Sequence, residues 1–231
     1  MTAFAPGKCI LFGEHAVVYG QPAVAVSIDA GVEVTIRESN SWILEGMPFE
    51  PSRHPHISHI INDIFDYTGK PLKIDIKSGL FSAAGLGSSA ALSNSMGAAL
   101  HQLVNPDEPL DLISLARIGH SAEANAQKGR ASPTDTATSA LGGCVVVSGE
   151  RVKGTQHVFD ATLETPEGSR SWSICRASLP QVDDTWIVLG FTGIGSPTGR
   201  MVAGVAELIE REPQKMDDIR AIGEITSSGL D

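Results

Sequence analysis

Residues 82–91 read SAAGLGSSAA, and this stretch decides how the rest of the chain is interpreted. It follows an alternating apolar segment, residues 72–77, and precedes a run with helical periodicity. Gly85 and Gly87 allow backbone conformations that a side chain would forbid, and they let main-chain N–H groups come close to a ligand. A helix that begins near Ser88 would turn its free N–H groups and its positive dipole end toward the same ligand. The stretch is therefore a candidate phosphate-binding loop.

Alternatively, the Gly/Ser-rich stretch is only a turn that connects a strand to a helix and binds no ligand. The stretch has neither the GK[ST] ending of a Walker A loop nor the GxGxxG spacing of a dinucleotide-binding loop. Its meaning therefore depends on the other motifs of the chain.

Composition excludes some classes of function. The chain has 231 residues, 42% of them hydrophobic, which is enough for one large core or two modest ones. The formal net charge of −10 argues against a nucleic-acid partner, because no basic face balances it. An anionic substrate must then be captured by local donors.

Cysteine usage and the N-terminus bear on location. Cys9, Cys144 and Cys175 are far apart and form no CxxC pair, so they are interpreted as small core residues in a reducing cytosol. The N-terminus lacks a charged region followed by an apolar one, and no apolar run approaches about 18 residues. The sequence thus predicts a soluble, cytoplasmic protein that does not bind membranes.

The first segment, TAFAPGKCILFGEHAVVYG at residues 2–20, places polar groups at both ends of a short buried strand, residues 9–12. Lys8 precedes this strand, and Glu14 and His15 follow it, so the three are candidates for one site. Alternatively, Lys8 is exposed to solvent and the other two are turn residues.

The next 60 residues contain strands and one helix. Alternation predicts strands over residues 21–38 and 72–77, with a partner strand at residues 42–45. Helical spacing predicts an amphipathic helix over residues 56–68. His54, His56 and His59 cluster near its start, but no cysteine or carboxylate completes a metal-ligand spacing, so we expect helix entry and solvent exposure for them.

Two helices follow the glycine-rich stretch. Residues 90–104 are rich in small residues and predict a central, buried helix, and residues 109–129 predict another with Asp111 near its start. Glu123 falls on the apolar stripe of the second helix. A buried carboxylate is costly without compensation, so we expect a metal or salt-bridge partner. The alternative is that Glu123 lies exposed at a frayed helix end.

Asp135 stands in a Ser-Pro-Thr-Asp-Thr turn, where an aspartate commonly caps the following helix, a role that does not exclude catalysis. Beyond it we expect strands at residues 144–148 and 186–191, a strand pair within 151–177, and helices that begin at residues 197 and 217. A domain boundary near Asp183 divides the chain into residues 1–183 and 184–231. The second part then has one strand and two helices, with nothing to complete its sheet.

The ordered motifs PGKCILFGEHAVVYG, AAGLGSSAA and ASPTDTATSALGG resemble the GHMP kinase superfamily, and GEHAVVYG most closely resembles the mevalonate kinase family within it. The SPTDT form is more similar to archaeal members. The resemblance covers residues 5–143 strongly and residues 185–205 weakly.

The resemblance implies a two-domain α/β (α+β) GHMP kinase fold. Its N-terminal domain would be like ribosomal protein S5 domain 2, and its C-terminal domain would be ferredoxin-like. It also implies ATP-dependent phosphorylation of the primary hydroxyl of mevalonate to 5-phosphomevalonate, a step of isoprenoid synthesis, with ATP and Mg²⁺ as cofactors. Mevalonate and ATP are then the small-molecule partners.

The resemblance also assigns roles to residues. Asp135 would be the catalytic base, and Lys8 would stabilise the alkoxide and keep the aspartate ionised. Ser89 and Glu123 would hold Mg²⁺, an oxygen-ligand role. The ATP phosphates would be wrapped by Gly85, Leu86, Gly87, Ser88, Ser89 and Ala90, and the substrate pocket would be lined by Glu14, His15 and Thr198.

Two departures from the family pattern stand out. The interval from Glu123 to Asp135 is one residue longer than in relatives, and residues 127–130 absorb the difference. The third glycine-rich motif of the family, expected near the C-terminus, is missing, so the sequence is expected to be truncated.

Two alternative functions remain open. One is another GHMP small-molecule kinase, acting on phosphomevalonate or homoserine, and the other is a non-catalytic nucleotide-binding protein with this fold. The presence of Lys8, Ser89, Glu123 and Asp135 together argues against the second. The sequence does not fix the oligomeric state, and a homodimer stays open.

Overall fold

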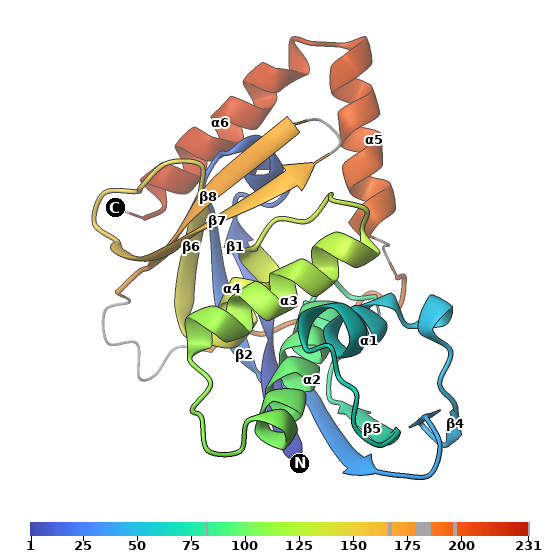
Figure 1. Cartoon of the computed structure of the whole chain (residues 1–231). Helices are drawn as coiled ribbons and strands as arrows, with labels where there is room; N and C mark the ends of the chain where they lie inside the picture. Colours follow the sequence, from blue (N-terminus) through green and yellow to red (C-terminus); the bar gives the residue numbers. More distant parts are fainter. Residues whose placement is uncertain (82, 166–167, 179–185, 196–197, 231) are drawn as a thin grey trace.

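The computed structural model describes residues 1–81, 83–165, 168–178, 186–195 and 198–230, without the side chains of residues 165 and 198–200. An eight-stranded mixed sheet forms its centre, with the strand order β4-β3-β5-β2-β6-β8-β7 and β1 paired to β2 (Figure 1). The strands are β1 Thr2–Phe12, β2 Ala23–Glu38, β3 Ile43–Leu44, β4 Met47–Pro48, β5 Leu72–Ser78, β6 Cys144–Ser148, β7 Gln156–Thr165 and β8 Gly168–Arg176.

The 16-residue strand β2 organises this sheet, because it pairs antiparallel with β1, β5 and β6. Its alternation is the predicted one: Val32, Val34 and Ile36 are buried, whereas Arg37 is exposed. The predicted strand at residues 9–12 is longer in the structure, because pairing with β2 extends it back to Thr2.

Helices α1 to α4 cover one face of the sheet (Figure 1). They lie at α1 Pro55–His59, α2 Ser88–Val104, α3 Leu112–Ala126 and α4 Thr134–Leu141. The short helical segments are the 3-10 turns η1 Ala16–Tyr19 and η2 Pro51–Arg53 and the π-helix η3 Ile60–Ile64. As predicted, α2 is central: its small residues Ala90, Ala91 and Ala99 are fully buried.

The helix predicted over residues 56–68 ends earlier than expected. It begins at Pro55 and continues as the π-helix η3 only to Ile64. Asp66 then takes a left-handed conformation with φ 42°, which a helix cannot continue through. The predicted strand at residues 42–45 similarly shrinks to Ile43–Leu44.

The prediction of a strand at residues 186–191 is wrong. These residues are described without regular structure, and Trp186 and Val188 are 87% and 91% exposed. Their apolar run suggested a buried strand, but no described strand pairs with the segment, and a strand needs a partner for its backbone groups. The proposed boundary at Asp183 lies outside the described residues.

Two helices follow, α5 Thr198–Arg211 and α6 Lys215–Ser228, close to the predicted positions. Helix α6 packs on η1 and β2, where Gly223 lies against Gln21. No helix in the described part of the chain combines the length and apolarity that a bilayer crossing needs.

Candidate active site

The glycine-rich loop is held against the first strand of the sheet. Helix α2 begins at Ser88, as predicted, and Gly87 caps it in the left-handed conformation with φ 70°. The N–H of Lys8 donates to the carbonyl of Leu86 at 2.9 Å. This close approach needs Gly7, because a Cβ there would lie 2.7 Å from the same carbonyl. The loop and the start of β1 therefore form one unit.

Lys8 reaches from this unit to the start of α4. Its Nζ lies 3.1 Å from Oδ1 of Asp135, and the residue is only 3% exposed. Asp135 does not cap the helix: Pro133 occupies the cap position, and Asp135 stands in the first turn. The readings of Lys8 as solvent-exposed and of Asp135 as a helix cap are thus both wrong.

The pKa of the Asp135 carboxyl is raised above its ordinary value of 3.8. Burial is the largest cause, the adjacent Lys8 ammonium opposes it, and the nearby charges of Glu123 and Glu14 add to the rise. A carboxylate with a raised pKa is a stronger base and remains a hydrogen-bond acceptor next to a cation. The pair can therefore take a proton from a hydroxyl group and stabilise the resulting oxyanion.

Glu123 is buried on the apolar stripe of α3, as predicted, with 4% exposure. Its Oε1 lies 3.4 Å from Nε2 of His56, and its Oε2 accepts a hydrogen bond from the side-chain amide of Gln127. The hydroxyl group of Ser89 is a further polar neighbour that lowers the pKa of the carboxyl. Burial raises the pKa of Glu123, but these partners outweigh burial, so the net pKa is lowered and the carboxylate stays charged.

The solvent exposure expected for the three histidines is wrong, because each of them is only partly exposed. Helix α1 packs on α3 and covers two of them. His56 faces Glu123. His59 is 16% exposed in its side chain and bonds to Asp63 at 2.7 Å and to Ser121 at 2.9 Å.

Six of the predicted site residues line a common cavity of about 80 Å³, whereas the loop residues from Leu86 to Ala90 do not line it. The 3-10 turn η1 directs Glu14 and His15 to it, since His15 turns the chain at φ 64°. Of the predicted residues, the cavity brings together Lys8, Glu14, His15, Gly85, Glu123 and Asp135. The side chain of Thr198 lies outside the described residues, although its backbone begins α5.

The contacts of two residues with Glu123 were not predicted from the sequence. Gln127 is four residues after Glu123, so helical spacing could have placed it beside that carboxylate. His56 had no such signal, because only the packing of α1 on α3 brings it there.

Ser89 and Glu123 together fit a magnesium ion. Oε1 of Glu123 is buried and has no hydrogen-bond partner, so this oxygen could coordinate a cation. No group of three His, Cys, Asp or Glu side chains within the described residues could hold a metal. Mg²⁺, however, needs only one or two protein ligands when substrate phosphates and water complete its shell.

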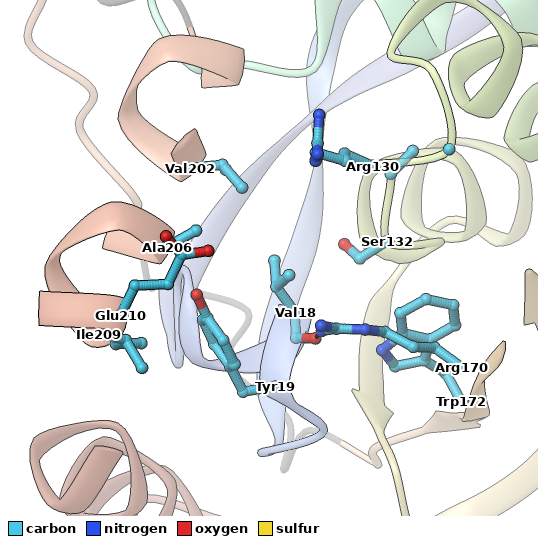
Figure 2. Close-up of a pocket in the computed structure, with 12 residues that line it drawn as sticks. Val18, Tyr19, Arg130, Ser132, Arg170, Trp172, Val202, Ala206, Ile209 and Glu210 are labelled. Carbon is cyan, nitrogen blue, oxygen red and sulfur yellow. Dashed lines mark hydrogen bonds between the residues drawn. The ribbon is translucent and has the colours of Figure 1, made fainter. Parts of the chain in front are cut away.

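A second cavity of about 190 Å³ adjoins the first, between α5 and the sheet (Figure 2). Arg170 spans its floor and donates to the carbonyl of Val18, while its guanidinium lies 5.6 Å from the centre of the Tyr19 ring. Helix α5 turns one face to it, with residues at spacings of four and three: Val202, Ala206, Ile209 and Glu210.

Comparison with known proteins finds relatives in the family that the sequence motifs resemble. The family model for the GHMP kinases N terminal domain matches residues 55–143. The mevalonate kinase of Methanothermobacter thermautotrophicus is 35% identical over 228 residues, which covers 94% of this chain and 65% of that relative. The mevalonate kinase of Archaeoglobus fulgidus is 32% identical over 227 residues, which covers 95% of this chain and 68% of that relative.

The chain therefore spans about two thirds of the length of these curated relatives. A solved structure gives the same fold: the Methanococcus jannaschii mevalonate kinase superposes with a TM-score of 0.65 at 21% identity, over all of this chain and 72% of that one.

Proposed function

This chain belongs to the mevalonate kinase family of the GHMP kinases, and we propose that it transfers the terminal phosphoryl group of ATP to the primary hydroxyl of mevalonate. The observation that carries the proposal is the ion pair of the buried Lys8 with the partly exposed Asp135, 3.1 Å apart, in the same cavity as Glu123 and beside the glycine-rich loop. Phosphoryl transfer needs these parts: a cradle for phosphates, a cation, a metal ligand and a group that orients the hydroxyl.

Asp135 accepts the proton of the substrate hydroxyl in this proposal, and Lys8 stabilises the alkoxide that forms. Positioning supplies much of the rate in such reactions, since the protein has little covalent chemistry to perform. The hydrogen bond from the Lys8 backbone to Leu86 fixes Lys8, the partner of the base, relative to the loop. Glu14 and His15 line the same cavity and would contact the substrate.

The ATP phosphates bind at the start of α2 in this proposal. Gly87 leaves the loop free of a Cβ at the helix end, where backbone N–H groups and the helix dipole attract anions. Ser89 and Glu123 would hold Mg²⁺, which neutralises charge on the phosphate oxygens when bound. The remaining proposed loop contacts are Gly85, Leu86, Ser88 and Ala90.

Residues 1–183 form the N-terminal domain in this proposal, which carries the ATP cradle and the catalytic residues, and residues 184–231 begin the C-terminal domain, with the site in the cleft. Thr198 at the start of α5 would then face the substrate. We also place the protein in the cytoplasm, which its three free cysteines support. The net charge of −10 supports small-molecule rather than nucleic-acid partners.

An ADP-release assay across mevalonate, phosphomevalonate, homoserine and galactose tests the substrate. We expect the highest kcat/KM for mevalonate. A preference for any of the other three would reject mevalonate as the substrate while keeping the kinase activity. ATP binding without ADP release on any of the four would instead favour a non-catalytic nucleotide-binding protein.

A further inference from the structure

The three helices that carry the proposed site meet at one buried polar side chain, Asn94. Helix α2 begins at the glycine-rich loop, α3 carries Glu123, and α4 carries Asp135 in its first turn. These helices pack on one another, and Asn94 on α2 is 0% exposed. Burying an amide costs free energy unless its polar atoms find hydrogen-bond partners. The surroundings of Asn94 therefore show what this cost maintains.

The amide of Asn94 forms a hydrogen bond from one helix to another. Its Nδ2 donates to the carbonyl of Thr136 on α4 at 2.9 Å. Its Oδ1 is buried and has no hydrogen-bond partner among the described residues. The opposite orientation of the amide would place Oδ1 against the carbonyl of Thr136, which is also an acceptor. The bond to α4 thus fixes the orientation of the side chain.

Helix α3 passes close to this amide at Gly119. A Cβ there would overlap the amide of Asn94 and would lie 3.2 Å from Cγ2 of Thr136. Gly119 stands four residues before Glu123, so the two residues lie on the same face of α3. On α4, Thr136 directly follows Asp135. The amide is therefore enclosed by a neighbour of the proposed base and by a residue one turn from the proposed metal ligand.

The first turn of α4 is internally bonded, so a bond to one of its carbonyls holds the whole turn. Oγ1 of Thr136 donates to the carbonyl of Pro133 at 3.2 Å, and Oγ1 of Thr138 donates to the carbonyl of Thr134 at 2.7 Å. A hydrogen bond is directional, whereas apolar contacts are not. The bond from α2 therefore restricts sliding of this turn more than apolar packing would.

The two neighbours of Asn94 on α2 are also buried and polar, but they bond within their own helix. Oγ of Ser93 donates to the carbonyl of Ser89 at 2.9 Å, and Oγ of Ser95 donates to that of Ala91 at 2.8 Å. Asn94 instead bonds to another helix and leaves an acceptor unpaired, which lowers stability. Departures of this kind from the rules of stability are expected where function requires them.

We propose that Asn94 is a positioning residue: its hydrogen bond to Thr136 holds the catalytic base in place relative to the glycine-rich loop. The inference rests on the proposed function, because it takes Asp135 as the base. Asn94 lines none of the described cavities, so it acts through α4 and not on the substrate. The ion pair of Lys8 links the loop to the base on one side, and Asn94 adds a second link.

The test compares Asn94→Thr with Ser95→Ala. Threonine has nearly the volume of asparagine, and its hydroxyl can bond to a carbonyl of its own helix, so the variant leaves no unpaired acceptor and does not reach α4. Ser95→Ala removes a buried hydroxyl from the next position of the same helix and leaves the link to α4 intact. Asn94→Ala removes the amide without adding a branched side chain, and it replaces Asn94→Thr if that variant does not fold.

We expect kcat for ADP release with mevalonate to fall about 10- to 100-fold in Asn94→Thr, because a displacement near 1 Å is sufficient for such a loss. KM for ATP should be unchanged, since the loop belongs to α2 itself. Urea unfolding should show Asn94→Thr to be at least as stable as wild type, because the unpaired acceptor is gone. Ser95→Ala should retain the wild-type kcat.

Hydrogen–deuterium exchange measures the position of α4 without turnover. Peptides that span residues 133–141 should exchange faster in Asn94→Thr than in wild type and in Ser95→Ala, because the first turn of α4 has lost its bond to α2.

Unchanged kcat or unchanged exchange of these peptides in Asn94→Thr would overturn the inference, and so would an equal loss of kcat in Ser95→Ala. The proposed function fails in a different way, since wild type would then release no ADP with mevalonate. The exchange measurement would in that case still report whether Asn94 holds α4.

Discussion

Gly87→Ala tests whether the glycine-rich loop and the ion pair form one unit. Gly87 has φ 70°, and a Cβ there would lie 2.9 Å from Cγ and 3.2 Å from Cε of Lys8. Lys8 is only 3% exposed, so its side chain cannot move aside into solvent. The added methyl group must therefore push the ammonium away from Asp135.

Two terms contribute to the magnitude. The left-handed conformation costs a residue with a Cβ about 1–2 kcal/mol. Overpacking a well-filled site costs about 1–3 kcal/mol more. Gly46→Ala is the matched control, because Gly46 has φ 76° and no atom within 4 Å of its added Cβ. Gly46→Ala should lose only the stability that the left-handed conformation costs. It should retain full activity, because Gly46 lies between β3 and β4 and lines none of the described cavities.

Urea unfolding at constant m-value measures the stability difference, and ADP release at saturating substrates measures kcat. We expect Gly87→Ala to lose about 1–3 kcal/mol more than Gly46→Ala and to lower kcat about 100-fold, as a displacement near 1 Å does. If the two variants were equally stable and equally active, Lys8 would not be held by the loop in the way described.

Three further perturbations test the site. The acid limb of the kcat/KM profile should lie above pH 3.8, because the pKa of Asp135 is raised and its carboxylate can accept a proton only above that pKa. Lys8→Met should move this limb to higher pH, because the variant lacks the cation that lowers the pKa of Asp135. A pH–rate profile of both proteins checks the sign, and a shift to lower pH would contradict it. His56→Ala should lower the free energy of unfolding, measured with urea, by about 1–3 kcal/mol, because Oε1 of Glu123 then stays buried without the imidazole beside it. His56→Gln should restore part of this loss. Equal stability of His56→Ala and wild type would contradict the role of this contact. Glu123→Gln should raise the Mg²⁺ concentration needed for half-maximal activity at least about 10-fold. The binding of ATP without metal, measured by calorimetry, should be unchanged. An unaltered Mg²⁺ dependence would remove Glu123 from the metal site.

Much of the site was predictable because its residues lie next to elements with strong local signals. The start of α2 at Ser88 followed from the glycines and from the helical run after them. The burial of Glu123 followed from the 3.6-residue period of α3, which does not depend on tertiary contacts. The helix cap at Asp111 also depends only on local sequence, because its carboxylate accepts hydrogen bonds from the N–H groups of Ile113 and Ser114.

The misjudged features depend on contacts between distant segments. His56 looked like an exposed residue at a helix entry, and only the packing of α1 on α3 makes it the partner of Glu123. The run at residues 186–191 had the hydrophobicity of a buried strand, but hydrophobicity does not supply a strand with its neighbours. Asp135 had the sequence context of a cap, and its true partner, Lys8, stands 127 residues earlier in the chain.

The central claim is that Asp135, paired with Lys8, takes the proton of the substrate hydroxyl. Single-turnover transfer of phosphate from radiolabelled ATP to mevalonate, measured in wild type and Asp135→Asn at equal ATP occupancy, tests it most directly. We expect labelled phosphomevalonate from wild type and a rate lower by roughly 100- to 10,000-fold in the variant, with ATP affinity unchanged. A variant that transfers phosphate at the wild-type rate would contradict it.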